Sequence, residues 1–412
     1  MKSVIHLFTA ILALSVVPQA SADLTIRLTG STAFRAGTHK AIVAMMGGEA
    51  NCRFAHGMIT GAATTANQAG YENADYTIIR GTAASIPGIT TVHCTWTGSA
   101  TGIRDVAQNN TLGFLAASQL PANTGYANAA VTQATSETAI PDFAFSDVFQ
   151  ASTPTPAPAL EDNLLAIIPF SWVANEGTTG ITNMTQQLAR ALYSNGSQPK
   201  KLFTGNDLAA DAEQLVLAVG RDNGSGTRIT QLAETQYGVF NTVQQWKLTS
   251  SGSPATVTVA QVWPLNDGVG AFATGNGGYS SGSTIRTLIG LTSAAVQLKN
   301  AAGTNVGTPQ AVSLLAFLGI TDSTTAVTNG AVRLSYEGVF YDGTNPKLIY
   351  QGLYTGWGYL HVYTKSGLST DQGQFRDNLA AQFDDVNVIG AAGLQVSQMQ
   401  VSRVNDGATV GP

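Results

Sequence analysis

Charged residues are scarce in this chain, and no long apolar run follows its first residues. Charged side chains make up 11% of the 412 residues, against about 25% in an average soluble domain. The formal net charge is −5, which leaves no basic face for a phosphate backbone and argues against nucleic acid as a partner. After the N-terminal region no run approaches about 20 apolar residues, so we expect no membrane-spanning helix.

Cysteine and histidine are scarce as well. Cys52 and Cys94 are the two cysteines. They form either one disulfide or two buried free thiols, because separation in sequence does not fix the distance between Cα atoms. None of the five histidines has the spacing from cysteine or carboxylate residues that a metal site requires. We therefore expect no metal and no cofactor.

The N-terminus has the pattern of a secretory signal peptide, residues 1–22. Lys2 precedes an apolar run from Val4 to Val17, and Ala20-Ser21-Ala22 forms a small-x-small cleavage site. Cleavage near Ala22 removes Lys2, so the formal net charge changes from −5 to −6. We expect a soluble protein that is periplasmic or secreted.

Strand-like and helix-like patterns alternate along the mature chain. Apolar runs typical of strands are Leu24 to Leu28, Thr91 to Trp96, Leu164 to Trp172 and Leu215 to Val219, and a helical pattern runs from Met184 to Tyr193. This alternation predicts an α/β protein with largely parallel sheets. The mature chain of about 390 residues is long enough for two domains.

The motif Arg221-Asp222-Asn223-Gly224-Ser225-Gly226-Thr227 lies just before a helical pattern. Such a turn directs backbone N–H groups and hydroxyls toward one point, where the helix dipole adds partial positive charge. Arg221 can bind two oxygens of one anion, Ser225 and Thr227 supply hydroxyls, and Gly226 allows close approach to the backbone. The motif is typical of an oxyanion site, although a Ser/Thr-Gly turn can also be a simple N-cap.

Two further turns repeat this chemistry. The strand ending at Leu28 leads into Thr29-Gly30-Ser31-Thr32-Ala33-Phe34, and the strand ending at Trp96 leads into Thr97-Gly98-Ser99-Ala100-Thr101-Gly102. Ligands collect at the carboxyl ends of strands in open α/β folds. Three Gly/Ser/Thr-rich turns before helices together favour a convergent anion site.

An aspartate at the end of a fourth segment gives this site a selective element. Asp147 follows the short apolar strand pattern of Asp142-Phe143-Ala144-Phe145-Ser146. A carboxylate can accept a hydrogen bond from a bound oxyanion only if one oxygen of that anion is protonated. It therefore tolerates hydrogen phosphate but repels sulfate. The alternative is that Asp147 is a solvated loop charge.

Together these segments resemble the extracytoplasmic phosphate-binding proteins that feed ABC importers, and the chain looks like a divergent member of that family. The strongest match is Arg221 to Thr227, which is similar to the family signature Arg-x-Asp-Gly-Ser-Gly-Thr. Asn223 stands where the family usually carries an aspartate that orients the arginine. Ser99 matches the serine of the family's Gly-Ser-x-Gly-Gly turn, and Asp142 to Asp147 is similar to its Asp-Phe-Gly-x-Ser-Asp segment.

The resemblance implies a phosphate site that two lobes share. Its ligand-binding residues would be Thr32, Ala33, Ser99, Asp147, Arg221, Ser225, Gly226 and Thr227. A second alignment sets Thr111 to Ser118 against the aspartate segment. Ser118 would then replace Asp147, and the site would lose its carboxylate.

The resemblance also implies the two-lobed type II periplasmic binding protein fold. Each lobe would have a mostly parallel sheet flanked by helices, and a crossing hinge would join the lobes. Lobe one would comprise residues 23–163 and 335–412, and lobe two residues 164–334. Segments 111–141 and 284–328 are expected to be insertions.

The function that the resemblance implies is binding without catalysis. A monomer would capture inorganic phosphate and deliver it to the membrane permease of an ABC importer. One alternative is a phosphate-binding-like protein that serves as a sensor or surface module. Another is a serine hydrolase, because Gly278-Tyr279-Ser280-Ser281-Gly282 fits G-x-S-x-G and Asp322 or Asp342 and then His361 follow. The Gly-rich residues before Ser280 argue against the hydrolase.

Overall fold

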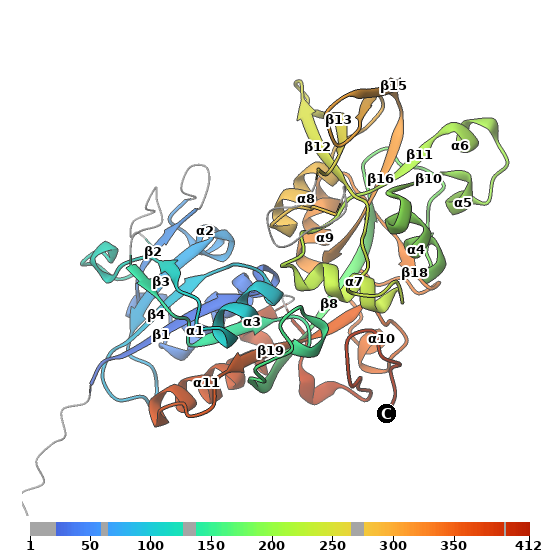
Figure 1. Cartoon of the computed structure of the whole chain (residues 1–412). Helices are drawn as coiled ribbons and strands as arrows, with labels where there is room; N and C mark the ends of the chain where they lie inside the picture. Colours follow the sequence, from blue (N-terminus) through green and yellow to red (C-terminus); the bar gives the residue numbers. More distant parts are fainter. Residues whose placement is uncertain (1–21, 59–64, 127–136, 265–275, 391–392) are drawn as a thin grey trace, which may run out of the picture.

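One long β-sheet runs through both halves of the molecule (Figure 1). The computed structural model describes residues 22–58, 65–126, 137–264, 276–390 and 393–412. In these residues the strand order of the sheet is β10-β11-β16-β8-β19-β7-β1-β4-β3-β2, and β17 pairs with β8 beside this path. Helices pack around the sheet, so the chain is an α/β protein, as the sequence predicts.

The first lobe, on the left of Figure 1, consists of the chain before β8 and two helices near the C-terminus. In this lobe β1 runs parallel to both of its neighbours, β4 and β7. Helix α1 contacts α11 and α12, while α3 packs against β7 and β1. The elements are β1 (Leu24–Gly30), η1 (Thr32–Phe34), α1 (Arg35–Met45), η2 (Glu49–Asn51), β2 (Arg53–Gly57), α2 (Gln68–Asn73), β3 (Tyr76–Gly81), β4 (Thr90–Thr95), α3 (Ser99–Ala107), β5 (Leu112–Phe114), η3 (Ala117–Gln119), β6 (Glu137–Ala139), β7 (Phe143–Ser146), η4 (Gln150–Ser152), α11 (Thr370–Phe383) and α12 (Val386–Ile389).

The second lobe, on the right of Figure 1, lies between β8 and α10 in the sequence. Strand β11 runs parallel to β16 and antiparallel to β10. Helices α8 and α9 contact each other and β16. The elements are β9 (Asn183–Met184), α4 (Gln186–Asn195), β10 (Ser197–Pro199), α5 (Lys201–Thr204), α6 (Ala209–Glu213), β11 (Leu215–Ala218), α7 (Gly226–Glu234), β12 (Trp246–Ser251), β13 (Thr256–Val262), α8 (Gly282–Ile289), β14 (Val296–Lys299), β15 (Asn305–Gln310), β16 (Val312–Gly319), α9 (Ile320–Thr328), β17 (Val332–Arg333) and β18 (Ser335–Tyr336).

The strand β8 (Glu161–Ala174) belongs to both lobes. Its first part pairs with β19 (Trp357–Thr364), and its last part, from Phe170, pairs with β16. Its residues from Leu165 onward are buried, which matches the continuous apolar run that predicts this strand. After the second lobe, α10 (Lys347–Tyr350) leads to β19, and η6 (Val396–Gln398) follows α12. The chain therefore passes between the lobes along strands that pair with each other.

The sheets are mixed, and the prediction of mostly parallel sheets is wrong. Parallel pairs join β1 to β4, β1 to β7 and β11 to β16, whereas β2, β3, β8 and β19 pair antiparallel with their neighbours. The connection from β3 to β4 has no helix, and such short connections join antiparallel strands. The strands expected from the four apolar runs are nevertheless present, as β1, β4, β8 and β11.

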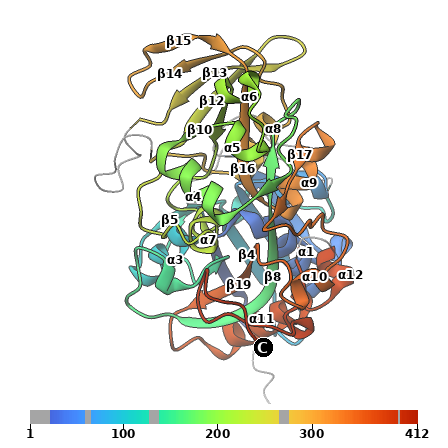
Figure 2. The same cartoon turned by 90° about the vertical axis from the view of Figure 1, so that its right-hand side faces the viewer.

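The two segments expected to be insertions contribute differently. Within 111–141, the described residues form β5, η3 and β6, which pair outside the main sheet. Segment 284–328 supplies β14 and β15 to the separate sheet β12-β13-β14-β15, which lies at the far end of the second lobe in Figure 2. It also supplies β16, a strand inside the main sheet, so it is not simply an appendage.

The two cysteines are buried and free, so the disulfide interpretation does not hold. Cys94 pairs with Thr77 across β4 and β3, and Thr77 pairs with His56 across β3 and β2. Cys52 lies just before β2, so it is two strands away from Cys94 and is also displaced along the strand direction from His56. Adjacent strands are about 4.8 Å apart, so this placement exceeds disulfide reach. Burial raises the pKa of both thiols to about 12.

The expected signal peptide, residues 1–22, lies almost wholly outside the described residues, which begin at residue 22. In the described part of the chain, no helix has both the length and the apolar character needed to span a membrane.

Candidate anion site between the lobes

Three strand-to-helix turns meet where the two lobes touch. The turns after β1 and β4 are held together because these strands are parallel neighbours, and the Gly98 N–H donates to the carbonyl of Gly30 at 2.8 Å. The turn before α7 joins them from the second lobe, where the Gly224 carbonyl accepts from the Ala100 N–H at 3.0 Å. The N-termini of η1, α3 and α7 therefore converge, as the sequence motifs predict.

Asp147 lies at this meeting point, directly after β7, with 1% of its surface exposed. Its Oδ1 accepts a hydrogen bond from the Ser99 hydroxyl at the start of α3, and its own N–H donates to the Ser99 Oγ at 3.4 Å. Its Oδ2 is buried and has no hydrogen-bond partner among the described residues. One carboxylate oxygen is thus left to accept a hydrogen bond from something else.

Burial raises the pKa of Asp147. The hydrogen bond from Ser99, the positive charge of Arg221 and the hydroxyl of Ser31 act in the opposite direction. Burial has the largest effect, so the net result is a raised pKa of Asp147.

The start of α7 packs directly on this aspartate. A Cβ atom on Gly226 would lie 1.8 Å from the Asp147 Oδ1 and 2.5 Å from the Ser99 Oγ, so only glycine fits there. Ser225 caps the helix, since its hydroxyl oxygen accepts from the Arg228 N–H at 3.4 Å. Gly226 and the buried Thr227 form the first turn, whose N–H groups lack intrahelical acceptors. The positive end of the α7 dipole therefore faces the Asp147 carboxylate.

Arg221 joins the two lobes beside this helix. Its Nη2 donates to the Thr32 Oγ1 of the first lobe at 3.2 Å and to the Ser280 carbonyl at 2.7 Å, while Nε donates to the Tyr279 carbonyl at 3.0 Å. Backbone carbonyls therefore orient the guanidinium, and Asn223 takes part in none of these contacts. Arg221 is 4% exposed.

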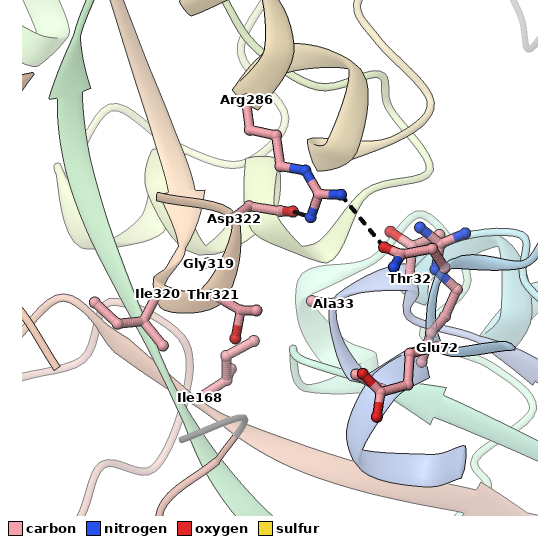
Figure 3. A pocket seen from close by; sticks show the side chains of 12 residues that line it. Thr32, Ala33, Glu72, Ile168, Arg286, Gly319, Ile320, Thr321 and Asp322 are labelled. Carbon is pink, nitrogen blue, oxygen red and sulfur yellow. Dashed lines mark hydrogen bonds and ion pairs between the residues drawn. The ribbon is translucent and has the colours of Figure 1, made fainter. Parts of the chain in front are cut away.

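A small chamber adjoins the Thr32 side of this contact (Figure 3). Arg286 of α8 spans it, donating to the Asp322 Oδ1 at 2.8 Å and to the Asn73 Oδ1 of the first lobe at 3.3 Å. Both lobes and β8 line the chamber, through Thr32, Ala33, Arg35, Ala36, Glu72, Asn73, Ile168, Arg286, Gly319, Ile320, Thr321 and Asp322.

The structure places the sequence-predicted residues as follows. Direct contacts connect Ser99, Asp147 and Gly226 in one group and Thr32 with Arg221 in another. Ser225 and Thr227 lie in the same α7 turn as Gly226, and Ala33 lies next to Thr32 at the chamber. Ser118, the alternative to Asp147, is exposed in η3.

The hydrolase residues do not come together in the described structure. His361 is buried in β19, where its Nδ1 lies 2.8 Å from the Asp162 Oδ1. Ser280 is exposed, and its carbonyl accepts from Arg221. Asp322 binds Arg286, and Asp342 binds Thr344. Among the described residues, no group of three or more His, Cys, Asp or Glu side chains could hold a metal ion.

Thr32 and Ala33 are the predicted site residues that line the chamber, and its arginines were not predicted. Arg35, Arg286 and Asp322 come from α1, α8 and α9, and no local motif marks them. Ser31 could have been found, since it lies in the Gly-Ser-Thr turn after β1 and caps η1 through the Ala33 N–H at 3.3 Å.

No family model and no curated protein matches the chain. Among solved structures, a protein assigned as a phosphate ABC transporter substrate-binding protein from Clostridium perfringens, with bound phosphate, has a TM-score of 0.48 at 12% identity, covering 90% of this chain and 99% of that one. An ABC-type phosphate transport receptor from Vibrio cholerae has a TM-score of 0.45 at 14% identity, covering 89% and 98%. An OxyR mutant from Corynebacterium glutamicum has a TM-score of 0.37 at 10% identity, covering 92% and 70%. With these TM-scores below 0.5, no ligand or partner follows from the likenesses.

Proposed function

We propose that this protein is an exported solute-binding protein that captures inorganic phosphate between its lobes and delivers it to an ABC importer. The observation that carries the proposal is the buried Asp147 carboxylate, with one unpartnered oxygen, at the N-termini of α3 and α7 and near Arg221. This combination supplies many donors and one acceptor. Phosphate near neutral pH presents many acceptor oxygens and at least one P–OH, so it complements this set.

Binding requires the lobes to separate first. In the structure Gly226 packs on Asp147, Arg221 reaches Thr32, and the Ala100 N–H binds the Gly224 carbonyl, so the anion site is closed. A phosphate ion can enter only when α7 moves away from the first lobe. Because contacts from both lobes then form on one ligand, phosphate shifts the population toward closure.

The first test is calorimetric titration of the signal-free protein, unfolded and refolded to remove any ligand carried through purification. We expect phosphate to bind and sulfate to give no heat, because sulfate has no proton for Asp147. Binding heat with both anions would mean that the carboxylate does not discriminate between phosphate and sulfate. No binding heat with either anion would refute phosphate capture.

Asp147→Asn should change selectivity more than affinity. The amide keeps the size of the side chain but removes the negative charge and adds donors, so sulfate should bind at least about tenfold more tightly than to the native protein. Phosphate binding should be retained. The measurement is the same titration with both anions, and Ser118→Ala serves as the matched control. Unchanged sulfate rejection in Asp147→Asn would assign the selective acceptor elsewhere.

A further inference from the structure

A small chamber lies beside Thr32, next to the contacts that Arg221 makes with the first lobe. Its volume is about 40 Å³. One water molecule needs roughly 10–15 Å³ of such space, so the chamber can hold about three water-sized groups. Because first-lobe residues, second-lobe residues and β8 line it, whatever fills it is enclosed by closure of the lobes (Figure 3).

The negative charges at the chamber already have partners. Asp322 accepts from Arg286 at 2.8 Å. Glu72 lies 3.6 Å from the ammonium of Lys40 and accepts from the Gln68 side chain at 2.6 Å. Both carboxylates therefore have a cationic side chain nearby and do not need a positively charged group of a ligand.

The positive charges leave a donor unsatisfied. Arg35 is 6% exposed, and its guanidinium donates to the Asp75 Oδ1 at 3.2 Å and across the lobes to the Ser281 Oγ at 3.5 Å. Its Nε–H is buried without a hydrogen-bond partner in the described part of the chain. A buried charged donor without an acceptor is unfavourable. An acceptor that reached this N–H would relieve the cost, and an anionic acceptor would also be attracted by the charge of Arg35.

The chamber and the candidate anion site share one residue, Thr32. Thr32 lines the chamber, and its hydroxyl accepts from Arg221. Ala33, Ala36 and Ile168 add an apolar wall suited to a short carbon link. A ligand that spans both places would therefore have to pass Thr32.

We propose that the preferred ligand is a phosphonate whose short substituent ends in a carboxylate that lies in this chamber. The inference rests on the proposed anion site and narrows its ligand class. The phosphoryl group occupies the site of Asp147 and Arg221, and the carboxylate accepts from Arg35 and faces Arg286. Such a ligand is held by both lobes at two points, so it favours closure more than inorganic phosphate does.

The test compares phosphate, methylphosphonate and phosphonoacetate by calorimetry on the refolded, signal-free protein. We expect phosphonoacetate to bind at least tenfold more tightly than the other two. Ala36→Leu, which fills the chamber, and Arg35→Lys, which keeps the charge beside Asp75 but removes the Nε–H, should each abolish that advantage. Ala36→Leu should leave phosphate affinity within about twofold, and thermal unfolding checks that both variants fold.

The outcomes separate this inference from the proposed function. Phosphate binding without a phosphonoacetate advantage would overturn the chamber assignment and leave phosphate capture intact. An advantage that survives in Ala36→Leu would also overturn it. Binding of phosphonoacetate alone would support the chamber and remove inorganic phosphate as the ligand. No binding of any of the three would refute both proposals.

Discussion

Arg221→Ala is expected to weaken phosphate binding by about 100-fold or more. The guanidinium is buried, and it reaches from the second lobe to Thr32 of the first. Its positive charge would therefore lie next to an anion bound between the lobes. Removing it leaves the negative charge of phosphate uncompensated near Asp147, and truncating one partner of a buried charge pair costs about 2–5 kcal/mol. A loss of 100-fold corresponds to about 2.7 kcal/mol. Calorimetric titration with phosphate measures it.

The controls separate charge from geometry and from folding. Arg190→Ala removes an arginine of the same lobe that contacts Gln187 at the surface, and it should bind phosphate as the native protein does. Arg221→Lys keeps the charge but loses the fork that binds two oxygens, so its affinity should lie between the two. Thermal unfolding of each variant checks that it folds, since the carbonyls of Tyr279 and Ser280 lose their Arg221 donors in Arg221→Ala. Native affinity in a folded Arg221→Ala would remove this residue from the site.

The parts of the site that local sequence can specify are the turns. A Gly/Ser/Thr-rich turn before a helix carries its chemistry within about six residues, and three such turns mark the ends of β1 and β4 and the start of α7. Parallel pairing of β1 with β4 then brings the first two together, which is a general property of such sheets. That is why the sequence could indicate that the turns carrying Ser99 and Thr32 lie close together; their role in binding stays a prediction.

The chamber could not be predicted in this way. Arg35 and Arg286 are far apart in sequence, and they line one cavity only because the lobes close against each other. A single arginine in a helix is more often a surface charge than a ligand contact, so neither residue gives a signal of its own.

The direction of strand pairing, parallel or antiparallel, could likewise not be predicted from the sequence patterns. Apolar runs locate β1, β4, β8 and β11, but a run has no sign that distinguishes parallel from antiparallel pairing. The directions follow from the connections, which join β3 to β4 without a helix and return β19 beside β8. The central strand β16 was missed because its segment was treated as an insertion.

The C-terminal segment of the chain contacts the C-terminus of α7. Arg403 forms a 2.9 Å ion pair with Glu234, the last residue of the helix, and the two side chains are 1% and 7% exposed. Its guanidinium also stacks on Trp357 of β19 at 3.9 Å and donates to the Thr355 carbonyl at 2.9 Å. The helix whose N-terminus forms part of the candidate anion site is thus fixed at its C-terminus to β19.

Arg403→Met should therefore destabilise the protein by about 3 kcal/mol, because it leaves the Glu234 carboxylate buried without its cation. Urea unfolding measures this, with Arg376→Met as the matched control. Arg376 pairs with Asp377, which is 62% exposed, so that loss should stay below about 1 kcal/mol. Adding Glu234→Gln to Arg403→Met should recover most of the stability, since no unpaired charge remains.

The pH dependence of this variant has a definite sign. Burial raises the pKa of Glu234, and the charge of Arg403 opposes that rise, so removing Arg403 moves the pKa further up. A carboxyl group whose pKa is higher in the folded than in the unfolded state binds more protons when folded, and stability then increases as pH falls. The destabilisation by Arg403→Met should accordingly be largest at neutral pH and shrink as pH falls through the raised pKa of Glu234. A loss of stability independent of pH would instead assign the effect of Arg403 to its packing on Trp357.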